Sequence, residues 1–214
     1  MKVIAVNGSP RKKWNTATLL QKALDGAASV GAQTEMIHLY GLDYKGCISC
    51  FSCKRKGGTA GHCAVRDDLT EVLEKVLGCD ALLLGSPIYF GNITGEMLCF
   101  LERLLFSNLS YNTDHRSVFR GKLPSAFFYT MNLPAEGMKK FNYEELFHHY
   151  RDLLKRFGGA PSEILACNDT YQFDDYSKYE ASMFNEEHKA HVKAEQFPIV
   201  CQKAFETGVR LAER

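Results

Sequence analysis

The sequence has 214 residues, of which 45% are hydrophobic and 24% are charged, as is usual for a globular protein. Lysine and arginine number 26 and aspartate and glutamate 25, so the net charge of +1 gives no support for nucleic acid or a membrane surface as a partner. No apolar run approaches the roughly 20 residues needed to span a bilayer, and we expect a cytoplasmic protein.

Five short apolar segments alternate with helical patterns along the first three quarters of the chain. The predicted strands are Lys2–Val6, Thr34–Leu39, Ala81–Gly85, Ser125–Thr130 and Glu163–Ala166. The expected helices between them are Thr16–Val30, Leu69–Leu77, Met97–Phe106 and Tyr143–Phe157. The strands lack strict alternation, which is typical of burial on both faces of a sheet. The pattern predicts a doubly wound α/β domain with a parallel sheet.

The C-terminal part differs in composition. Residues 168–198 are polar, rich in tyrosine and poor in aliphatic side chains, and a last helix is expected to reach about Ala212. Such a segment lacks the apolar residues for a core of its own. We therefore expect one domain over residues 1–167 and an extension over residues 168–214 that wraps this domain or a partner subunit. A mobile surface arm is the alternative.

The stretch NGSPRKKWNTATLL follows the first predicted strand and has the features of a phosphate-binding loop. Gly8 permits close backbone approach, Ser9 supplies a hydroxyl, and a helix is expected to begin near Asn15 or Thr16, both favourable N-cap residues. The first amides of that helix would be free to bind an anion. Neither a Walker nor a dinucleotide glycine pattern is present, so the loop suits one terminal phosphate, as on FMN. A polar connection without a ligand is the alternative.

A second stretch, GSPIYFGNITGEM, follows the third predicted strand. In a parallel sheet ordered 2-1-3-4-5 this strand ends beside the first one, at the switch point where ligands bind. Pro87 stiffens the turn, Gly91 lets the backbone approach a flat ligand, and Tyr89 and Phe90 offer aromatic surface. Thr94 is the expected N-cap of the next helix. The alternative is that both rings belong to a core or an interface.

Together the two stretches resemble the NAD(P)H-dependent FMN reductase family of flavodoxin-like proteins. The resemblance covers roughly residues 1–165 and implies a flavodoxin-like, five-stranded parallel sheet that binds FMN non-covalently. It implies phosphate contacts from Ser9, Arg11, Asn15, Thr16 and Ala17, and isoalloxazine contacts from Pro87, Ile88, Tyr89, Phe90, Gly91 and Asn92. Thr130 and Met131 are a weaker third match, and Trp14 departs from the family pattern, where this position is usually small or polar.

A cysteine-rich loop is expected over residues 46–66. Cys47, Cys50, Cys53 and Cys63 have the spacing C-x2-C-x2-C-x9-C. Two consecutive C-x2-C steps suit a [4Fe–4S] cluster better than zinc, whose sites more often use two separated pairs. Free or redox-active thiols are the remaining alternative. The cysteines outside this motif, expected to be buried small hydrophobes, are Cys79, Cys99, Cys167 and Cys201.

The cysteine motif is also similar to that of the iron–sulfur flavoproteins, a branch of the same family. This similarity implies a [4Fe–4S] cluster and electron passage to FMN, often across a subunit interface, and the wider resemblance implies a homodimer or homotetramer. The nine-residue gap before Cys63 is longer than is usual in that branch.

These observations lead us to expect an enzyme. It would be an FMN-dependent oxidoreductase that passes electrons from NAD(P)H or a ferredoxin-like donor through FMN to a small acceptor. No catalytic side chain is assigned, because hydride or electron transfer requires none. The alternative from another class is a non-enzymatic FMN electron carrier or a thiol redox sensor.

Overall fold

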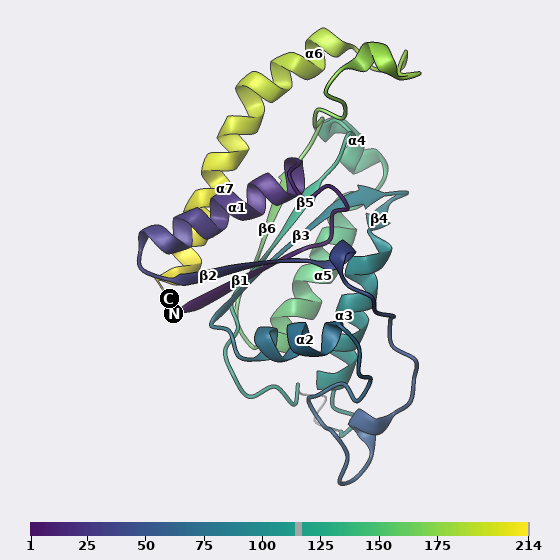
Figure 1. Cartoon of the computed structure of the whole chain (residues 1–214), viewed down its shortest axis with the longest axis vertical. Helices are drawn as coiled ribbons and strands as arrows, with labels where there is room; N and C mark the ends of the chain where they lie inside the picture. The colour runs from purple at the N-terminus through teal and green to yellow at the C-terminus, as the bar shows by residue number, and fades with distance from the viewer. Residues whose placement is uncertain (114–116, 214) are drawn as a thin grey trace.

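A computed structural model describes residues 1–113 and 117–213 of the chain (Figure 1). Among these residues the sheet has six strands, and its five long members are parallel in the order β2-β1-β3-β5-β6. The strands are β1 (Lys2–Asn7), β2 (Gln33–His38), β3 (Ala81–Tyr89), β4 (Asn92–Ile93), β5 (Ser125–Thr130) and β6 (Ser162–Cys167). This confirms the predicted doubly wound, flavodoxin-like sheet and its strand order.

The prediction of five strands needs one correction. The third strand does not end at Gly85 but continues to Tyr89, and the chain then reverses at Phe90 and Gly91, both of which have positive φ. The returning β4 pairs antiparallel with the end of β3. Pro87 and Gly91 are typical turn residues, so the sequence alone predicts a loop over this whole stretch.

Helices cover both faces of the sheet. They are α1 (Asn15–Ser29), α2 (Leu69–Leu77), α3 (Gly95–Asn108), α4 (Ala135–Lys140), α5 (Tyr143–Gly158), α6 (Glu186–His191) and α7 (Phe197–Ala212). α1 and α7 lie on one face, and α2, α3 and α5 on the other (Figure 1). No helix within the described ranges is long and apolar enough to cross a bilayer.

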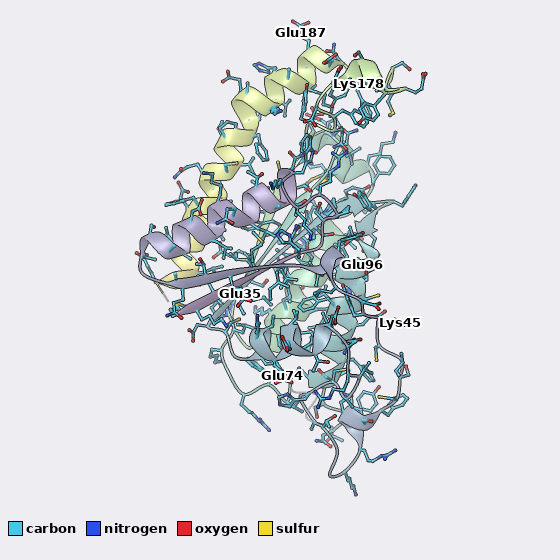
Figure 2. The ribbon with its side chains drawn as sticks, viewed as in Figure 1. Glu35, Lys45, Glu74, Glu96, Lys178 and Glu187 are labelled. Atoms are coloured by element: carbon cyan, nitrogen blue, oxygen red, sulfur yellow. The ribbon has the colours of Figure 1, made fainter. Side chains whose placement is uncertain are left out.

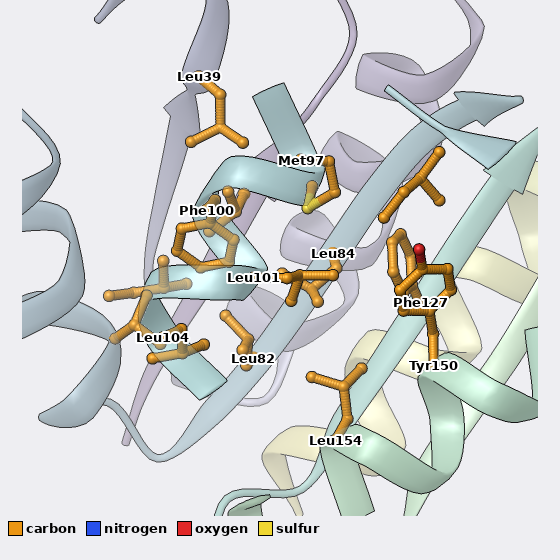
Figure 3. Close-up of a cluster of buried hydrophobic side chains, with 14 of the residues drawn as sticks. Leu39, Leu82, Leu84, Met97, Phe100, Leu101, Leu104, Phe127, Tyr150 and Leu154 are labelled. Atoms are coloured by element: carbon orange, nitrogen blue, oxygen red, sulfur yellow. The ribbon is translucent and has the colours of Figure 1, made fainter. Parts of the chain in front are cut away.

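Alternating strand residues divide the core into two layers. On one face, Leu82 and Leu84 of β3 pack with Phe100 and Leu104 of α3 and with Leu154 of α5 (Figure 3). These side chains are almost fully buried, and burial of each is worth about 1.5–3 kcal/mol. This layer fixes α3 and α5 beside the ends of β3 and β5.

The opposite layer depends on close packing between α1 and α7. A Cβ added to Gly26 would lie 2.0 Å from the Phe205 carbonyl oxygen, and one added to Gly208 would lie 1.8 Å from the Ala23 carbonyl oxygen. Both positions therefore admit only glycine at this helix separation. The last helix reaches Ala212 as predicted, and it ties the C-terminal extension to the domain.

The extension forms more structure than its composition predicts. Rings between residues 171 and 184 contact one another, and Phe173 stacks on Tyr179 with centroids 4.0 Å apart. α6 and a π-helical turn, η4 (Val192–Gln196), then lead into α7. Figure 2 shows Lys178 and Glu187 at the tip of the extension. Contacts between aromatic rings thus hold residues 171–184 together in place of an aliphatic core.

Candidate functional site

Three loops are tied together at the carboxyl end of the sheet. The backbone N–H of Gly8, after β1, donates to the carbonyl of Gly85 in β3 across 2.8 Å. The Thr94 hydroxyl donates to the Gly8 carbonyl across 2.7 Å, and the hydroxyls of Thr16 and Thr130 lie 2.7 Å apart. These contacts join the loops that follow β1, β3 and β5. The structure thus brings the three predicted loops to one place.

The first loop presents backbone amides to that place. Asn15, Thr16 and Ala17 begin α1, and among the described residues no acceptor contacts their backbone N–H groups. Ser9 is buried. Its backbone N–H donates to the Asn7 side chain across 3.0 Å, and its hydroxyl accepts from the backbone N–H of Arg11 across 3.2 Å. Free amides at the positive end of a helix fit one phosphate group.

α1 begins at Asn15, as predicted, but neither Asn15 nor Thr16 is its N-cap. The N-cap is Trp14, which has no side-chain acceptor for the helix amides. Asn15 instead donates its side-chain amide to the Tyr171 carbonyl across 3.0 Å, and the Thr16 hydroxyl faces Thr130. Leaving the cap position without an acceptor keeps the helix amides available to a ligand.

Two further side chains of this loop turn towards the C-terminal extension. Arg11 donates to the Gln172 carbonyl across 2.6 Å, and the Trp14 indole donates to the Tyr171 carbonyl across 3.2 Å. The Arg11 guanidinium also lies 5.0 Å from the centre of the Trp14 ring. The extension therefore packs against the first loop and forms one wall beside it.

The second loop forms an exposed turn. Tyr89 is half exposed and Phe90 fully exposed, while Pro87 and Ile88 are partly buried at its base. Gly91 has φ +81°, a conformation that side-chain-bearing residues avoid. These residues form the tight, open aromatic turn that the sequence predicted.

Asn92 and Thr94 anchor the returning arm of this turn. The Asn92 side-chain oxygen accepts from the Tyr150 hydroxyl of α5 across 3.0 Å and from the Ile93 amide across 2.8 Å. Thr94 caps α3 as predicted, accepting from the Met97 amide. The arm is thereby fixed between α3 and α5.

The cysteine loop lies at the other end of α3. Cys47, Cys50, Cys53 and Cys63 all line one small cavity of about 20 Å³. Burial raises the pKa of the Cys53 thiol. The nearby thiols of Cys47 and Cys50 raise this pKa further, whereas the Lys54 cation lowers it. Over the described ranges, however, no three histidine, cysteine, aspartate or glutamate side chains are arranged to hold a metal ion. The donor set has the chemistry of a cluster site, but the loop would have to rearrange around one.

Arg103 of α3 organises this loop, a role that was not predicted from the sequence. Its side chain has no exposed surface, and its guanidinium donates to Cys63 Sγ across 3.3 Å and forms an ion pair with Asp67. It also donates to the carbonyls of Lys45 and Val65, at 3.2 and 3.0 Å. One cation thus joins both ends of the loop. The available signal was a lone arginine in the apolar helical stretch MLCFLERLLF.

Lys54 makes a second link between the loop and α3. Its ammonium group donates to the carbonyls of Phe106 and, across 2.6 Å, of Leu109. It also lies 4.5 Å from the Phe106 ring centre. A cation at the carboxyl end of a helix satisfies free carbonyls and the helix dipole. The loop is therefore held by α3 at two points.

The cysteines outside the motif only partly match expectation. Cys79 and Cys167 are buried as predicted, and burial raises the pKa of each thiol to about 12. Cys99 and Cys201 are only half-buried, because they lie on helix faces at the margin of the core. His62 lies in the cysteine loop, and its ring pairs with Glu74 at 2.8 Å.

Comparison with known proteins gives relatives and structural neighbours. An iron–sulfur flavoprotein of Methanocaldococcus jannaschii is 39% identical over 103 residues, 48% of this chain and 51% of that protein. One of Archaeoglobus fulgidus is 34% identical over 122 residues, 57% of this chain and 51% of that protein. The aligned part thus spans about half the length of these relatives.

The fold of nearly the whole chain is similar to that of several solved structures. An NAD(P)H:quinone oxidoreductase of Methanothermobacter marburgensis matches with a TM-score of 0.70 at 15% identity, over 99% of this chain and 98% of that one. An FMN-dependent NADH-azoreductase of Bacillus anthracis, solved with FMN, matches with a TM-score of 0.66 at 14% identity. The match covers 99% of this chain and 100% of that one. These neighbours show the fold.

The family resemblance rests on the N-terminal part of the chain. Residues 1–137, which hold the first two loops, the cysteine loop and β5, match the family described as NADPH-dependent FMN reductase. The chain belongs to the NADPH-dependent FMN reductase family.

Proposed function

We propose that this protein is an FMN-dependent oxidoreductase that takes electrons from NAD(P)H and delivers them to a small acceptor. One observation carries the proposal: three loops meet at the carboxyl end of the sheet, where free helix amides lie beside an exposed aromatic turn. Family membership supports FMN as the ligand. Bound FMN would supply the hydride and electron chemistry.

The chain's own residues bind and orient that cofactor. The amides of Asn15, Thr16 and Ala17 bind the phosphate, together with Ser9 and Arg11. The turn formed by Pro87, Ile88, Tyr89, Phe90, Gly91 and Asn92 supports the isoalloxazine ring. The Thr16–Thr130 hydroxyl pair fixes the distance between the first and third loops. The Tyr150 hydroxyl donates to the Asn92 side chain and so holds the returning arm of the turn.

A steady-state assay tests this function. Protein purified with its flavin should oxidise NADPH or NADH in the presence of a soluble quinone, and acid extraction should release about one FMN per chain. A second preparation is assayed with a reduced ferredoxin as donor. Flavin that is reduced by the donor but never turns over with any acceptor would favour a non-enzymatic electron carrier.

For the cysteine loop we propose a [4Fe–4S] cluster held by Cys47, Cys50, Cys53 and Cys63. The observation that favours it is that all four thiols line one cavity, with an Arg103 N–H group directed at Cys63. Hydrogen bonds to the sulfurs and nearby positive charge are means by which a protein tunes such a cluster. Iron-sulfur flavoproteins among the relatives add support.

Iron and acid-labile sulfide assays on protein purified without air test the cluster. About four irons per chain, lost in a Cys63→Ala variant but retained in Cys79→Ala, would support it. Zinc in place of iron would make the loop a zinc site. Free thiols with no metal would make it a redox-active thiol loop.

We also propose that the protein works as a homodimer or homotetramer. α3 separates the cysteine loop from the aromatic turn, and its 14 residues span roughly 20 Å. Exposed rings at Tyr89, Phe90 and Phe51 offer apolar surface near both places. Sedimentation of the flavin-loaded protein measures its oligomeric state, and a monomer at micromolar concentration would contradict the proposal.

A further inference from the structure

A second cavity lies beside the phosphate loop. It measures about 290 Å³, close to the lower limit for small-molecule sites. Arg11, Lys13 and Trp14 line one side, and Phe173 and Tyr179 of the extension line the other. The family match ends at residue 137, so this wall belongs to the part of the chain that the family does not describe.

Hydrogen bonds hold the two walls together. Arg11 and Trp14 donate to consecutive backbone carbonyls of the extension, those of Gln172 and Tyr171. The backbone N–H of Gln172 in turn donates to the hydroxyl of the buried Tyr176 across 3.0 Å. The cavity is therefore built by specific contacts rather than by a loose arm.

The lining combines flat rings with cations. Trp14 is half-buried with the Arg11 guanidinium over its ring, and Tyr179 is 54% exposed while stacked on Phe173. Exposed ring faces stack on heterocyclic bases, and Arg and Lys side chains bind phosphate oxygens. The Asp174 carboxylate, also in the lining, accepts hydrogen bonds from a ribose or an amino group. This set matches a purine nucleotide.

We propose that this cavity binds the adenosine phosphate moiety of an adenine dinucleotide. The inference rests on the proposed NAD(P)H-dependent function and adds a site to it. Two ligands contain such an adenosine phosphate moiety, NAD(P)H and FAD. The position next to the free amides of α1 places the site beside the flavin phosphate.

The test uses the flavin-loaded protein and 2′,5′-ADP, which has no redox chemistry. Trp14 is the sole tryptophan, so its fluorescence reports on this cavity directly. Calorimetry with 2′,5′-ADP should give a dissociation constant below about 1 mM, together with a change in Trp14 emission. Tyr179→Ala and Lys13→Gln should each weaken binding about fivefold, and Lys22→Gln, at an exposed lysine of α1, should leave it unchanged.

The flavin released on denaturation identifies the source. If it is FMN and 2′,5′-ADP raises the KM for NADPH competitively, the site binds the adenosine of NAD(P)H. If it is FAD, and Tyr179→Ala shifts the released flavin towards FMN, the site binds the adenosine of FAD. FMN-loaded protein that does not bind 2′,5′-ADP, or binds it equally in both variants, overturns the proposal. Turnover without 2′,5′-ADP binding would refute this site alone, and binding without turnover would refute only the reductase function.

Discussion

The Nε atom of Arg103 donates a hydrogen bond to Cys63 Sγ across 3.3 Å, from a side chain with no exposed surface. A buried cation is tolerated only where its charge and its N–H groups are satisfied. Here the Asp67 carboxylate balances the charge, and the Lys45 and Val65 carbonyls at the two ends of the cysteine loop accept two further N–H groups. The loop and the guanidinium therefore depend on each other.

Replacing Arg103 should destabilise the protein strongly. Arg103→Gln leaves Asp67 without its partner, and breaking a buried ion pair costs about 3–5 kcal/mol. Arg103→Lys should recover only part of this loss, because one ammonium group cannot reach all the acceptors. Urea denaturation measures both variants, with Arg66→Gln, an exposed arginine of the same loop, as the control. A change below about 1 kcal/mol in Arg103→Gln would contradict this account.

Thr94 should couple the stability of α3 to flavin binding. Its hydroxyl accepts from the Met97 amide and donates to the Gly8 carbonyl. Thr94→Val keeps the shape but removes both bonds, and loss of an N-cap costs about 0.5–2 kcal/mol. We expect a lower free energy of unfolding and weaker FMN binding, measured by flavin fluorescence. Thr94→Ser should retain both properties; equal loss in the two variants would show that the methyl group matters instead.

The aromatic turn should require glycine at position 91. Gly91 has φ +81°, and of the residues that the structure describes only the Tyr143 ring, at 3.8 Å, lies near an added Cβ, so backbone strain rather than crowding decides the cost. Gly91→Ala should lose roughly 1–2 kcal/mol and weaken FMN binding. Gly95→Ala in the first turn of α3 is the matched control, since its Cβ would meet no atom of the described residues within 4 Å and its φ is not positive. Equal FMN affinity in both variants would remove the turn from the flavin site.

The parts that followed from the sequence are those set by local patterns. Apolar runs located the five long strands, and Thr94 was recognisable as a cap. The length of β3 was not predictable in this way, because its last residues include Pro87 and pair with β4, which lies beyond the turn. Trp14 as N-cap and Arg103 as organiser of the cysteine loop also escaped prediction. Their partners lie far along the chain, at Tyr171 and Cys63.

The extension should lose stability in acid through Asp169. Burial alone would raise the pKa of this carboxyl, but hydrogen bonds from Lys189 and His188 outweigh it and hold the pKa below its ordinary value. A carboxyl with a lowered folded-state pKa stabilises the fold above its unfolded pKa, and that contribution is lost as pH falls through the folded one. Asp169→Asn should therefore be less stable than the wild type at neutral pH, and the difference should shrink below about pH 4.

Denaturation curves at several pH values give this comparison. The buried Lys189 ammonium also donates to the Asn132 side chain across 2.6 Å, so the contact fixes the extension to the loop after β5. Asp174→Asn, at an exposed carboxylate in the same extension, is the control for the loss of one negative charge. A stability difference for Asp169→Asn that stayed constant down to pH 3 would rule out the ion pair as its cause.

Thiol reactivity should divide the cysteines by position. Burial raises the pKa of Cys79 and of Cys167 to about 12, so neither forms a thiolate at neutral pH and neither is reached by a reagent. Cys50 is exposed at the surface of the cysteine loop. Iodoacetamide applied to iron-free native protein, followed by peptide mass spectrometry, should label Cys50 first and the two buried thiols only after unfolding. Early labelling of Cys167 would mean that the contact between α7 and β6 opens in the native protein, because Cys167 lies in the core layer that α7 covers.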